Sequence, residues 1–167
     1  MDDQGDREYA RTPQIQDLIA LCKSLNEQEV RYLVIGGFAV ILQGYLRGTK
    51  DIDLLVEPSA ENVRRIKKAL SFLPDNAAAE LGEDEIEKYE VVRVADEIVV
   101  DLMAKACGIG YAEAKASIEY RNIEGVKIPV AKKELLIRLK QSVRPSDQSD
   151  VEFLRYRLEE ERKKQSR

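Results

Sequence analysis

Apolar residues recur along the chain at two spacings, one typical of amphipathic helices and one typical of buried strands. After Thr12-Pro13, leucine and isoleucine positions repeat at helical spacing, which predicts a helix that begins at this pair. The apolar run 30–35 stops at Gly36-Gly37 and predicts a buried strand followed by a tight turn. The first predicted elements are therefore a helix, a strand and a glycine turn.

Strands and helices continue to alternate through the rest of the sequence. The patterns predict, in order, a helix over residues 38–46, a strand over 51–56, a helix capped by Ser59, a loop or poorly defined helix over 74–87, a hairpin over 89–103, a helix over 111–118, a hairpin over 120–130, a helix over 132–143 and a last helix capped by Ser146. The charged tail 159–167 is expected to be frayed. We predict one α/β (α+β) domain, with a core over residues 1–130 and a helical C-terminal extension over 131–167 packed on it.

Composition and charge are those of an ordinary globular protein. The 167 residues suffice for one sizeable core, 44% of them are hydrophobic and 35% are charged. A net charge of -4 gives no general attraction to nucleic acid, so a nucleic-acid partner would need a local basic patch. No apolar run approaches the roughly 20 residues that span a bilayer. The first residues are polar and acidic and predict no secretory signal, so we expect no membrane partner.

The residue types that are absent or scarce restrict the chemistry. The sequence has no histidine, which excludes histidine-based nucleophilic catalysis, imidazole zinc sites and histidine general bases. Its two cysteines, Cys22 and Cys107, lack metal-ligand spacing, and we interpret both as small buried side chains in a reducing, cytoplasmic setting. Carboxylates with a hard cation such as magnesium become the leading option for catalysis.

Asp51 and Asp53 interrupt an apolar strand with two carboxylates on one face. Residues two apart in a strand point to the same side, so Ile52 and Leu54 face the core while the aspartates project together. Two adjacent carboxylates repel each other unless a cation lies between them. Asp101 repeats the pattern near the end of another apolar run, and the three carboxylates would converge if the two strands are neighbours. Such a set suits one or two magnesium ions.

Simpler interpretations stay open for these residues. A D-x-D tripeptide is common, and it is also consistent with Asp51 as a cap of the strand and Asp53 as a solvated residue at a sheet edge. Gly36-Gly37 is consistent with a strand-to-helix turn that needs positive φ, or with backbone N–H groups that cradle a phosphate. The acidic residues downstream favour the phosphate interpretation, although the sequence lacks a Walker lysine motif.

The segment GGFAVILQGYLRGTKDIDLLVEP, with Asp101 further on, resembles the GG-type nucleotidyltransferases of the DNA polymerase β-like superfamily. The resemblance is specific over residues 32–56, moderate over 97–103 and weaker over 128–151. It extends to small bacterial proteins, including aminoglycoside- and lincosamide-modifying relatives and abortive-infection toxins. It implies a nucleotidyltransferase-like mixed β-sheet flanked by helices, with a metal site at the end of the first strands. Many superfamily members carry serine where Gly37 stands, so here only backbone groups would serve a phosphate.

The resemblance also implies roles for individual residues. Asp51, Asp53 and Asp101 would hold the catalytic metal, one or two Mg²⁺ ions, and Asp101 would assist deprotonation of an acceptor hydroxyl. The cations among the nucleotide-binding candidates would neutralise the triphosphate of an NTP donor, and plain surface charge is the alternative for each of them. The nucleotide-binding candidates are Gly36, Gly37, Arg47, Thr49, Lys50 and Lys140.

Together these observations predict a magnesium-dependent nucleotidyltransferase. It would move a nucleoside monophosphate from an NTP to an acceptor hydroxyl and release pyrophosphate. The acceptor stays open among a small molecule, a tRNA end and a protein. Two alternatives use the same residues: a non-catalytic nucleotide-binding or toxin–antitoxin-type interaction module, and a metal-dependent phosphohydrolase. A partner protein or a homodimer is compatible with the sequence.

Overall fold

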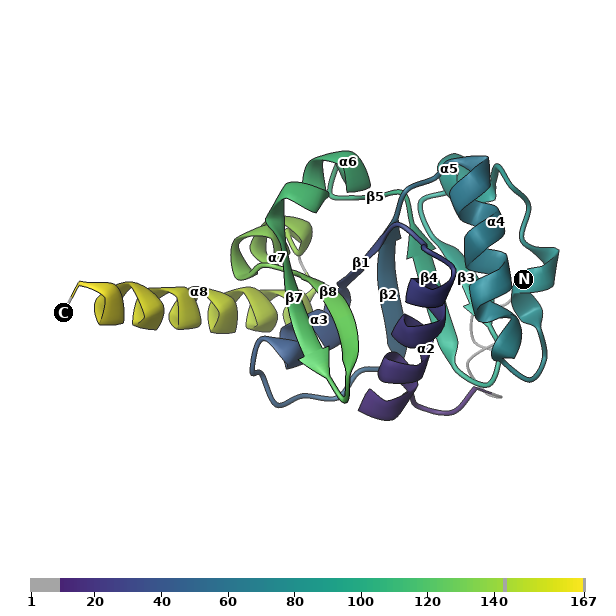
Figure 1. Ribbon diagram of the computed structural model, residues 1–167. Coiled ribbons are helices and arrows are strands. Elements are labelled where there is room, and N and C mark those ends of the chain that lie inside the picture. Colours follow the sequence, from purple (N-terminus) through teal and green to yellow (C-terminus); the bar gives the residue numbers. More distant parts are fainter. Residues whose placement is uncertain (1–9, 143, 167) are drawn as a thin grey trace.

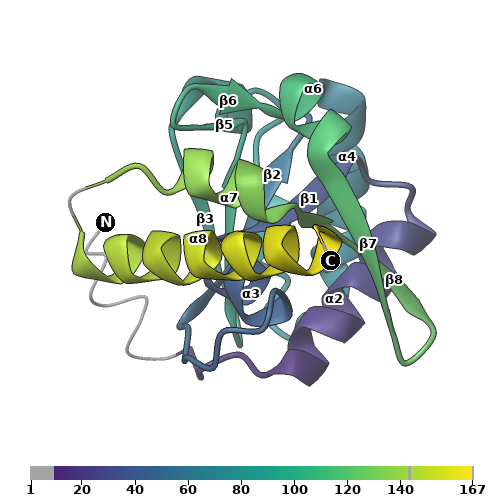
Figure 2. The same cartoon turned by 90° about the vertical axis from the view of Figure 1, so that its left-hand side faces the viewer.

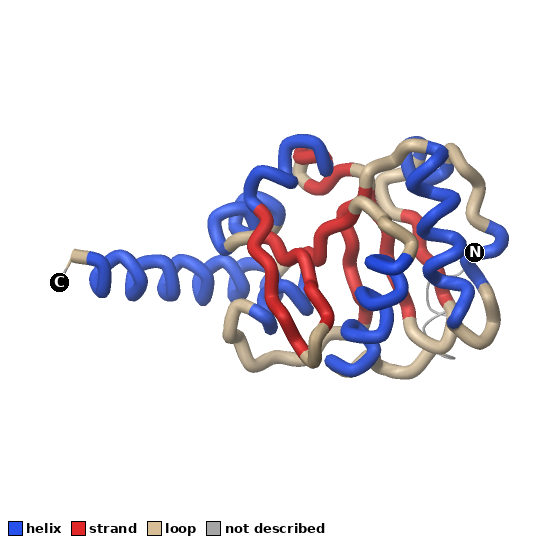
Figure 3. Tube along the Cα trace, in the orientation of Figure 1, coloured by secondary structure: helices blue, strands red, loops and turns tan. Residues whose placement is uncertain are grey.

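A mixed β-sheet forms the middle of the molecule (Figures 1 and 3). The computed structural model describes residues 10–142 and 144–166. Within these residues the sheet has six strands: β1 (Tyr32–Ile35), β2 (Asp51–Val56), β3 (Val92–Ala95), β4 (Val99–Met103), β7 (Ile118–Ile123) and β8 (Val126–Ala131). Their spatial order is β3-β4-β2-β1-β8-β7. A separate small hairpin, absent from the sequence-based prediction, pairs β5 (Lys105–Ala106) with β6 (Ile109–Gly110).

Parallel and antiparallel pairs mix within the sheet. β1 pairs antiparallel with β2 and parallel with β8. β2 pairs parallel with β4, and the outer strands β3 and β7 pair antiparallel with β4 and β8. The mixed α/β architecture predicted from the sequence is therefore confirmed. Its consequence for function is that β2 and β4, the strands that carry the predicted aspartates, are direct neighbours.

Helices cover both faces of the sheet. They are α2 (Ile15–Glu27), α3 (Gly36–Leu42), α4 (Ala60–Ala69), α5 (Glu85–Lys88), α6 (Tyr111–Ala114), α7 (Lys133–Leu139) and α8 (Pro145–Gln165), with 3₁₀ turns η1 (Leu70–Phe72), η2 (Ala77–Glu80) and η3 (Lys115–Ser117). α2 and α4 pack together on one face, while α3 and α7 lie on the other (Figures 1 and 2). α8 packs on α7 and extends away from the sheet as a long arm.

Alternation along β2 explains how one strand serves both a core and a polar site. Ile52, Leu54 and Val56 are fully buried, whereas Asp51 and Asp53 are half-buried on the opposite face. Burial of each aliphatic side chain stabilises the fold by about 1.5–3 kcal/mol. The apolar face of the strand therefore anchors the backbone from which the two aspartates project.

The first described helix starts later than the sequence pattern predicts. α2 begins at Ile15, and its N-cap is Gln14 rather than Thr12. Asp17 closes a capping box by accepting a hydrogen bond from the Gln14 backbone N–H at 2.7 Å. Arg11 fixes the same carboxylate through two hydrogen bonds of 2.7 and 2.6 Å. The prediction of a Thr12 cap is wrong because this network satisfies the helix start two residues later.

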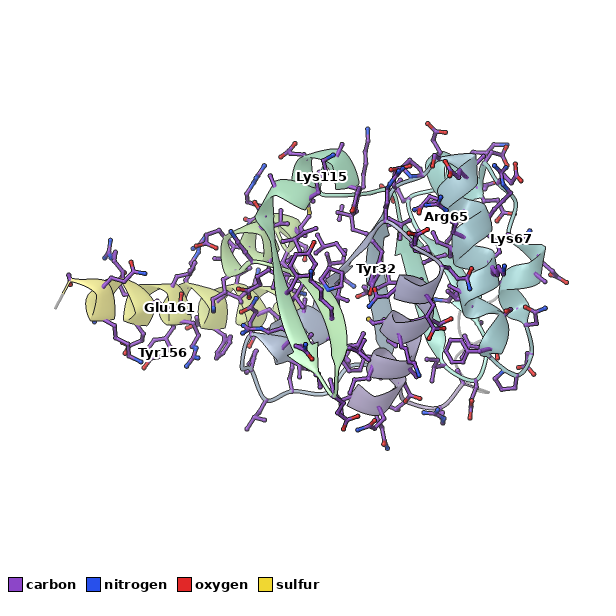
Figure 4. All side chains as sticks on the ribbon, in the orientation of Figure 1. Tyr32, Arg65, Lys67, Lys115, Tyr156 and Glu161 are labelled. Atoms are coloured by element: carbon purple, nitrogen blue, oxygen red, sulfur yellow. The ribbon has the colours of Figure 1, made fainter. Side chains whose placement is uncertain are left out.

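The C-terminal helices also differ from their predicted limits. α8 begins at Pro145 with Arg144 as its N-cap, so Ser146 lies inside the helix and does not cap it. The expected frayed tail is wrong, because α8 continues without a break to Gln165. Figure 4 shows Tyr156 and Glu161 on the part of this helix that extends beyond the body. α7 ends at Leu139, earlier than predicted; the expected end at residue 143 lies outside the described residues.

Other local predictions are confirmed or refined. Ser59 caps α4, since its hydroxyl accepts a hydrogen bond from the Asn62 backbone N–H at 3.3 Å. The β7–β8 hairpin turns at Glu124 and Gly125, both with positive φ, of 52° and 81°. The stretch 74–87 contains only short turns of helix, η2 and α5. The predicted helices over 38–46 and 111–118 shorten to α3 and α6.

The two cysteines have different environments. Cys22 is fully buried, as predicted, and burial raises the pKa of its thiol to about 12. Cys107 is exposed, so the prediction of a buried side chain is wrong there. It lies at the β5–β6 turn, where its Sγ is 3.2 Å from the backbone oxygen of Leu139. Turn geometry, which the sequence pattern missed, therefore decides its exposure. No helix in the described part of the chain is long and apolar enough to cross a membrane.

Leu154 is expected to anchor α8 to the body, because its side chain is completely buried. Leu154→Ala should reduce the free energy of unfolding by about 2–4 kcal/mol through lost burial and the cavity left behind. Tyr156→Ala is the matched control on the same helix, since that side chain is 62% exposed and its loss should change stability by less than about 0.5 kcal/mol. Urea unfolding followed by circular dichroism measures both; equal effects would contradict the anchoring role.

Candidate active site

One row of side chains crosses four strands on the aspartate face of the sheet. Strand register places Arg93 of β3 opposite Asp101 of β4, Asp101 beside Asp53 of β2, and Asp53 opposite Ile35 of β1. Asp51 lies two residues before Asp53 and projects from the same face. The parallel β2–β4 pairing thus brings Asp101 of β4 beside Asp51 and Asp53 of β2, as the sequence would require for the three carboxylates to converge.

Arg93 forms a two-pronged ion pair with Asp101. Its Nε donates to Oδ1 at 2.9 Å and its Nη2 donates to Oδ2 at 3.0 Å. The same Nη2 lies 3.4 Å from Oδ2 of Asp51. A guanidinium fork matches a carboxylate in one plane, so these bonds orient Asp101 as well as offset its charge.

Asp53 has a different environment from the other two aspartates. Its carboxylate makes no hydrogen bond with the described residues. Burial, together with the charges of Asp101 and Asp51, raises the pKa of Asp53 to about 7, and the cations Lys140 and Arg93 counteract this only in part. Burial and the neighbouring negative charges therefore disfavour the ionised form of the Asp53 carboxylate.

The glycine pair makes room for side chains from the strand and loop beside it. A Cβ on Gly36 would lie 2.0 Å from Oδ2 of Asp53, and the φ of Gly36 is +67°, so both space and backbone conformation require glycine. A Cβ on Gly37 would lie 2.6 Å from Oγ1 of Thr49. Each glycine therefore admits one polar side chain against the backbone at the start of α3.

A cavity of about 680 Å³ opens beside these groups, a size typical of sites for small ligands. Asp51 and Asp53 line it on the sheet side, and Ile35, Met103 and Leu139 contribute apolar surface. All the nucleotide-binding candidates from the sequence also line it: Gly36, Gly37, Arg47, Thr49, Lys50 and Lys140. Asp101 is not among the lining residues and is only 6% exposed beside Arg93.

Two of the predicted phosphate-binding cations are held by acids of α8. Asp150, whose side chain is 1% exposed, accepts a hydrogen bond from Nη1 of Arg47 at 2.6 Å and lies 2.9 Å from Nζ of Lys140. Lys140 also donates to Asp147 at 3.3 Å. Burial alone excludes plain surface charge for Lys140, whereas Lys50 is exposed at the rim. The first turns of α8 thus position cations of the cavity.

Electrostatics keep Asp147 ionised within this cluster. Burial acts to raise the pKa of Asp147, but a hydrogen bond from the Ser142 hydroxyl and the charges of Lys140 and Arg144 together hold it below its ordinary value. The Ser142 Oγ lies 2.6 Å from Oδ2 of Asp147. The cluster therefore keeps both signs of charge at neutral pH.

The aspartate set fits a hard divalent cation by its donor chemistry. Three carboxylates on neighbouring strands supply oxygen ligands, and a cation would relieve the repulsion that raises the pKa of Asp53. Within residues 10–142 and 144–166, however, no group of three acidic or cysteine side chains lies close enough together to hold a metal ion. The predicted convergence on one point is incomplete in this structure, in which Arg93 engages both Asp101 and Asp51.

Sequence analysis missed four charged residues of the site: Arg93, Arg144, Asp147 and Asp150. Arg93 is a charged residue in the middle of an apolar strand. The aspartates were recognised by the same pattern, so Arg93 could have been predicted from the sequence as a site residue. The two acids of α8 are typical of the first turns of any helix, where they complement the helix dipole. Only their tertiary contacts distinguish them.

Comparisons with known proteins support the fold. No known family profile and no curated protein sequence matches the chain significantly. A Thermotoga maritima protein assigned as a nucleotidyltransferase superposes with a TM-score of 0.58 at 18% identity, over 92% of this chain and 98% of its own. The lincosamide antibiotic adenylyltransferase LnuA, solved with lincomycin bound, superposes with a TM-score of 0.55 at 17% identity, over 87% of this chain and 98% of its own. The predicted nucleotidyltransferase-like fold is therefore confirmed.

Replacement of Gly36 by alanine is expected to destabilise the site strongly. Gly36→Ala combines positive φ with a clash against Asp53 and should cost about 3 kcal/mol or more. Gly125→Ala is the control, because its φ is +81° with nothing within 4 Å, so only backbone strain of about 1–2 kcal/mol applies. Chemical unfolding would show the difference, and equal losses would argue against the close approach of Asp53.

Replacement of Asp53 by asparagine is expected to stabilise the protein at high pH. Because the folded-state pKa is about 7 against an ordinary value of 3.8, the native protein loses stability as pH rises from about 4 to 7, and the loss is complete above pH 7. In EDTA, Asp53→Asn should therefore gain about 2–4 kcal/mol over the unsubstituted protein at pH 8 and less than about 1 kcal/mol at pH 4. Urea unfolding at both pH values measures this; a gain independent of pH would be inconsistent with it.

Proposed function

We propose that this protein is a magnesium-dependent nucleotidyltransferase of the GG type. It transfers a nucleoside monophosphate from an NTP to an acceptor hydroxyl and releases pyrophosphate. The observation that carries the proposal is the shared cavity, in which the carboxylates Asp51 and Asp53 and the cations Arg47, Lys50 and Lys140 line the same space. Transfer from an NTP needs both an acidic side for a metal ion and a basic side for phosphate charge. The nucleotidyltransferase-like fold supports the same conclusion.

The acidic row of the sheet would hold the cation. Asp51 and Asp53 contribute carboxylate oxygens from within the cavity, and Asp101 completes the set from its position beside Asp53. When bound, Mg²⁺ neutralises charge on the phosphates and orients the reacting groups. Arg93 engages both oxygens of Asp101, which makes Asp101 better suited to a fixed ligand than to a mobile proton acceptor.

The basic wall and the glycine pair would hold the triphosphate. Lys140 and Arg47 are fixed in orientation by Asp150, while Lys50 at the rim is free to adapt to the ligand. Thr49 places its hydroxyl against Gly37, where many superfamily members carry a serine. We assign to the Thr49 hydroxyl the phosphate contact that this serine would otherwise make.

Atoms and charges balance in the proposed transfer. The acceptor oxygen forms a bond to the α-phosphorus, and the bond from that phosphorus to the oxygen bridging to the β-phosphate breaks. Pyrophosphate leaves towards the cations of the cavity, and the acceptor proton passes to a carboxylate of the aspartate set. LnuA carries lincomycin in its structure, so hydroxyls of small molecules are the first acceptors to test.

Nucleotide binding is expected to depend on both magnesium and the aspartates. Isothermal titration with each of the four NTPs, with Mg²⁺ and with EDTA, should show binding only when the cation is present. Asp51→Asn combined with Asp53→Asn should weaken that binding at least about tenfold, since the cation ligands lose their charge. Asp75→Asn, an exposed acid in another loop, is the matched control and should bind as the unsubstituted protein does.

The reaction is tested by incubating the protein with Mg²⁺, NTP and a panel of hydroxyl acceptors. An acceptor that gains the mass of one nucleotide, together with released pyrophosphate, supports transfer. Loss of phosphate or pyrophosphate to water alone would identify a phosphohydrolase instead. Binding that persists in the double aspartate variant would reject the proposed site.

A further inference from the structure

Arg93 orients Asp101 in the proposed site, but the effect of its positive charge on cation binding is not yet accounted for. It comes from the edge strand β3, stands opposite Asp101 in the strand register, and has a side chain only 17% exposed. A positive charge beside a cation site is unfavourable for cation binding, because like charges repel. Its presence there therefore needs a physical reason beyond the packing of a sheet edge.

The position of Arg93 allows its positive charge to offset the repulsion among the aspartates. Asp53 and Asp101 are lateral neighbours on parallel strands, and Asp51 lies on the same face. Arg93 donates to both oxygens of Asp101, at 2.9 and 3.0 Å, and lies 3.4 Å from Asp51. It thus contacts two of the three carboxylates, and it lowers the pKa of the third, Asp53.

We propose that Arg93 is a built-in counter-charge of the aspartate set: it holds Asp101 in a fixed orientation and competes with a divalent cation for Asp51. The short fork to Asp101 is the persistent contact, and the longer contact to Asp51 is the one that yields when a cation binds. Arg93 thereby stabilises the folded protein in the absence of a cation, because it offsets the repulsion among the aspartates. The same positive charge weakens the binding of a cation. Arg93 is a positioning residue, since it acts through the aspartates.

This inference rests on the proposed function only in taking the three aspartates as the cation site. Its test needs no nucleotide and no turnover. Mn²⁺ is the probe, because free Mn²⁺ is counted directly by electron paramagnetic resonance and Mn²⁺ shares the preference of Mg²⁺ for carboxylate and water oxygens. Failure to transfer nucleotides would leave the measured Mn²⁺ affinity untouched, so the two proposals fail separately.

Removal of the charge should strengthen cation binding. Arg93→Met and Arg93→Gln should each bind Mn²⁺ about tenfold more tightly at low ionic strength, because each removes a positive charge that repels the cation. The gain should shrink as salt is added, because the interaction is screened. Arg93→Lys retains the charge, and its Mn²⁺ affinity should stay within about twofold of the unsubstituted protein.

Thermal unfolding provides the second readout. Without a divalent cation the Arg93→Met and Arg93→Gln proteins should unfold at a lower temperature than the unsubstituted protein. Addition of Mn²⁺ should raise their melting temperatures by more than it raises that of the unsubstituted protein. Arg64→Met is the control and should change neither quantity, because Arg64 is an exposed residue of α4 that pairs with Glu83 away from the aspartates.

The outcomes distinguish an electrostatic role of Arg93 at the cation site from a purely structural role in the sheet. Tighter Mn²⁺ binding in the two neutral variants, with affinity retained in Arg93→Lys, supports the proposal. Unchanged or weaker Mn²⁺ binding in the neutral variants overturns it, whatever their stability. If Arg93→Met does not fold, the comparison of Arg93→Gln with Arg93→Lys decides the question by the same criterion.

Discussion

Repulsion between carboxylates on adjacent strands is the constraint around which this site is organised. Parallel pairing of β2 with β4 sets Asp53 directly beside Asp101, and the pleat adds Asp51 to the same face. The apolar face of β2, with Ile52 and Leu54 fully buried, holds the backbone in this unfavourable arrangement. The penalty is visible in Asp53, whose pKa rises to about 7. A divalent cation, or a positive side chain, is what such an arrangement requires.

Positive charge reaches the acidic row from two directions. Arg93 approaches along the sheet from the edge strand and engages Asp101 and Asp51. Cations of the cavity approach from the helical side, where Asp150 of α8 positions Arg47 and Lys140. The first source offsets charge within the row, and the second places cations along the lining of the cavity. This division of labour is consistent with a site for a metal ion and a polyphosphate together.

The elements with strong local signals were predictable, and those decided by turns or distant contacts were not. β2 and the Ser59 cap agree with the sequence pattern because alternation and capping are local effects. The Thr12 cap failed because Arg11 and Asp17 build a different helix start, and the β5–β6 hairpin was missed because its strands are only two residues long. Within the site, the structure places the glycines, Thr49 and Lys140 along one cavity, whereas the three carboxylates do not converge on one point in the described residues.

Residue types and their period along each strand determined the chemistry offered by this protein: carboxylates on one face, a glycine turn, and no histidine. Those properties depend on neighbours along the chain, so they can be deduced from sequence alone. Only the tertiary structure determined which charged side chains contact one another. The parallel β2–β4 register, the fork from Arg93 and the buried bridge of Asp150 join residues 8 to 103 positions apart. Such long-range contacts follow from the packing of strands and helices, which no local pattern specifies.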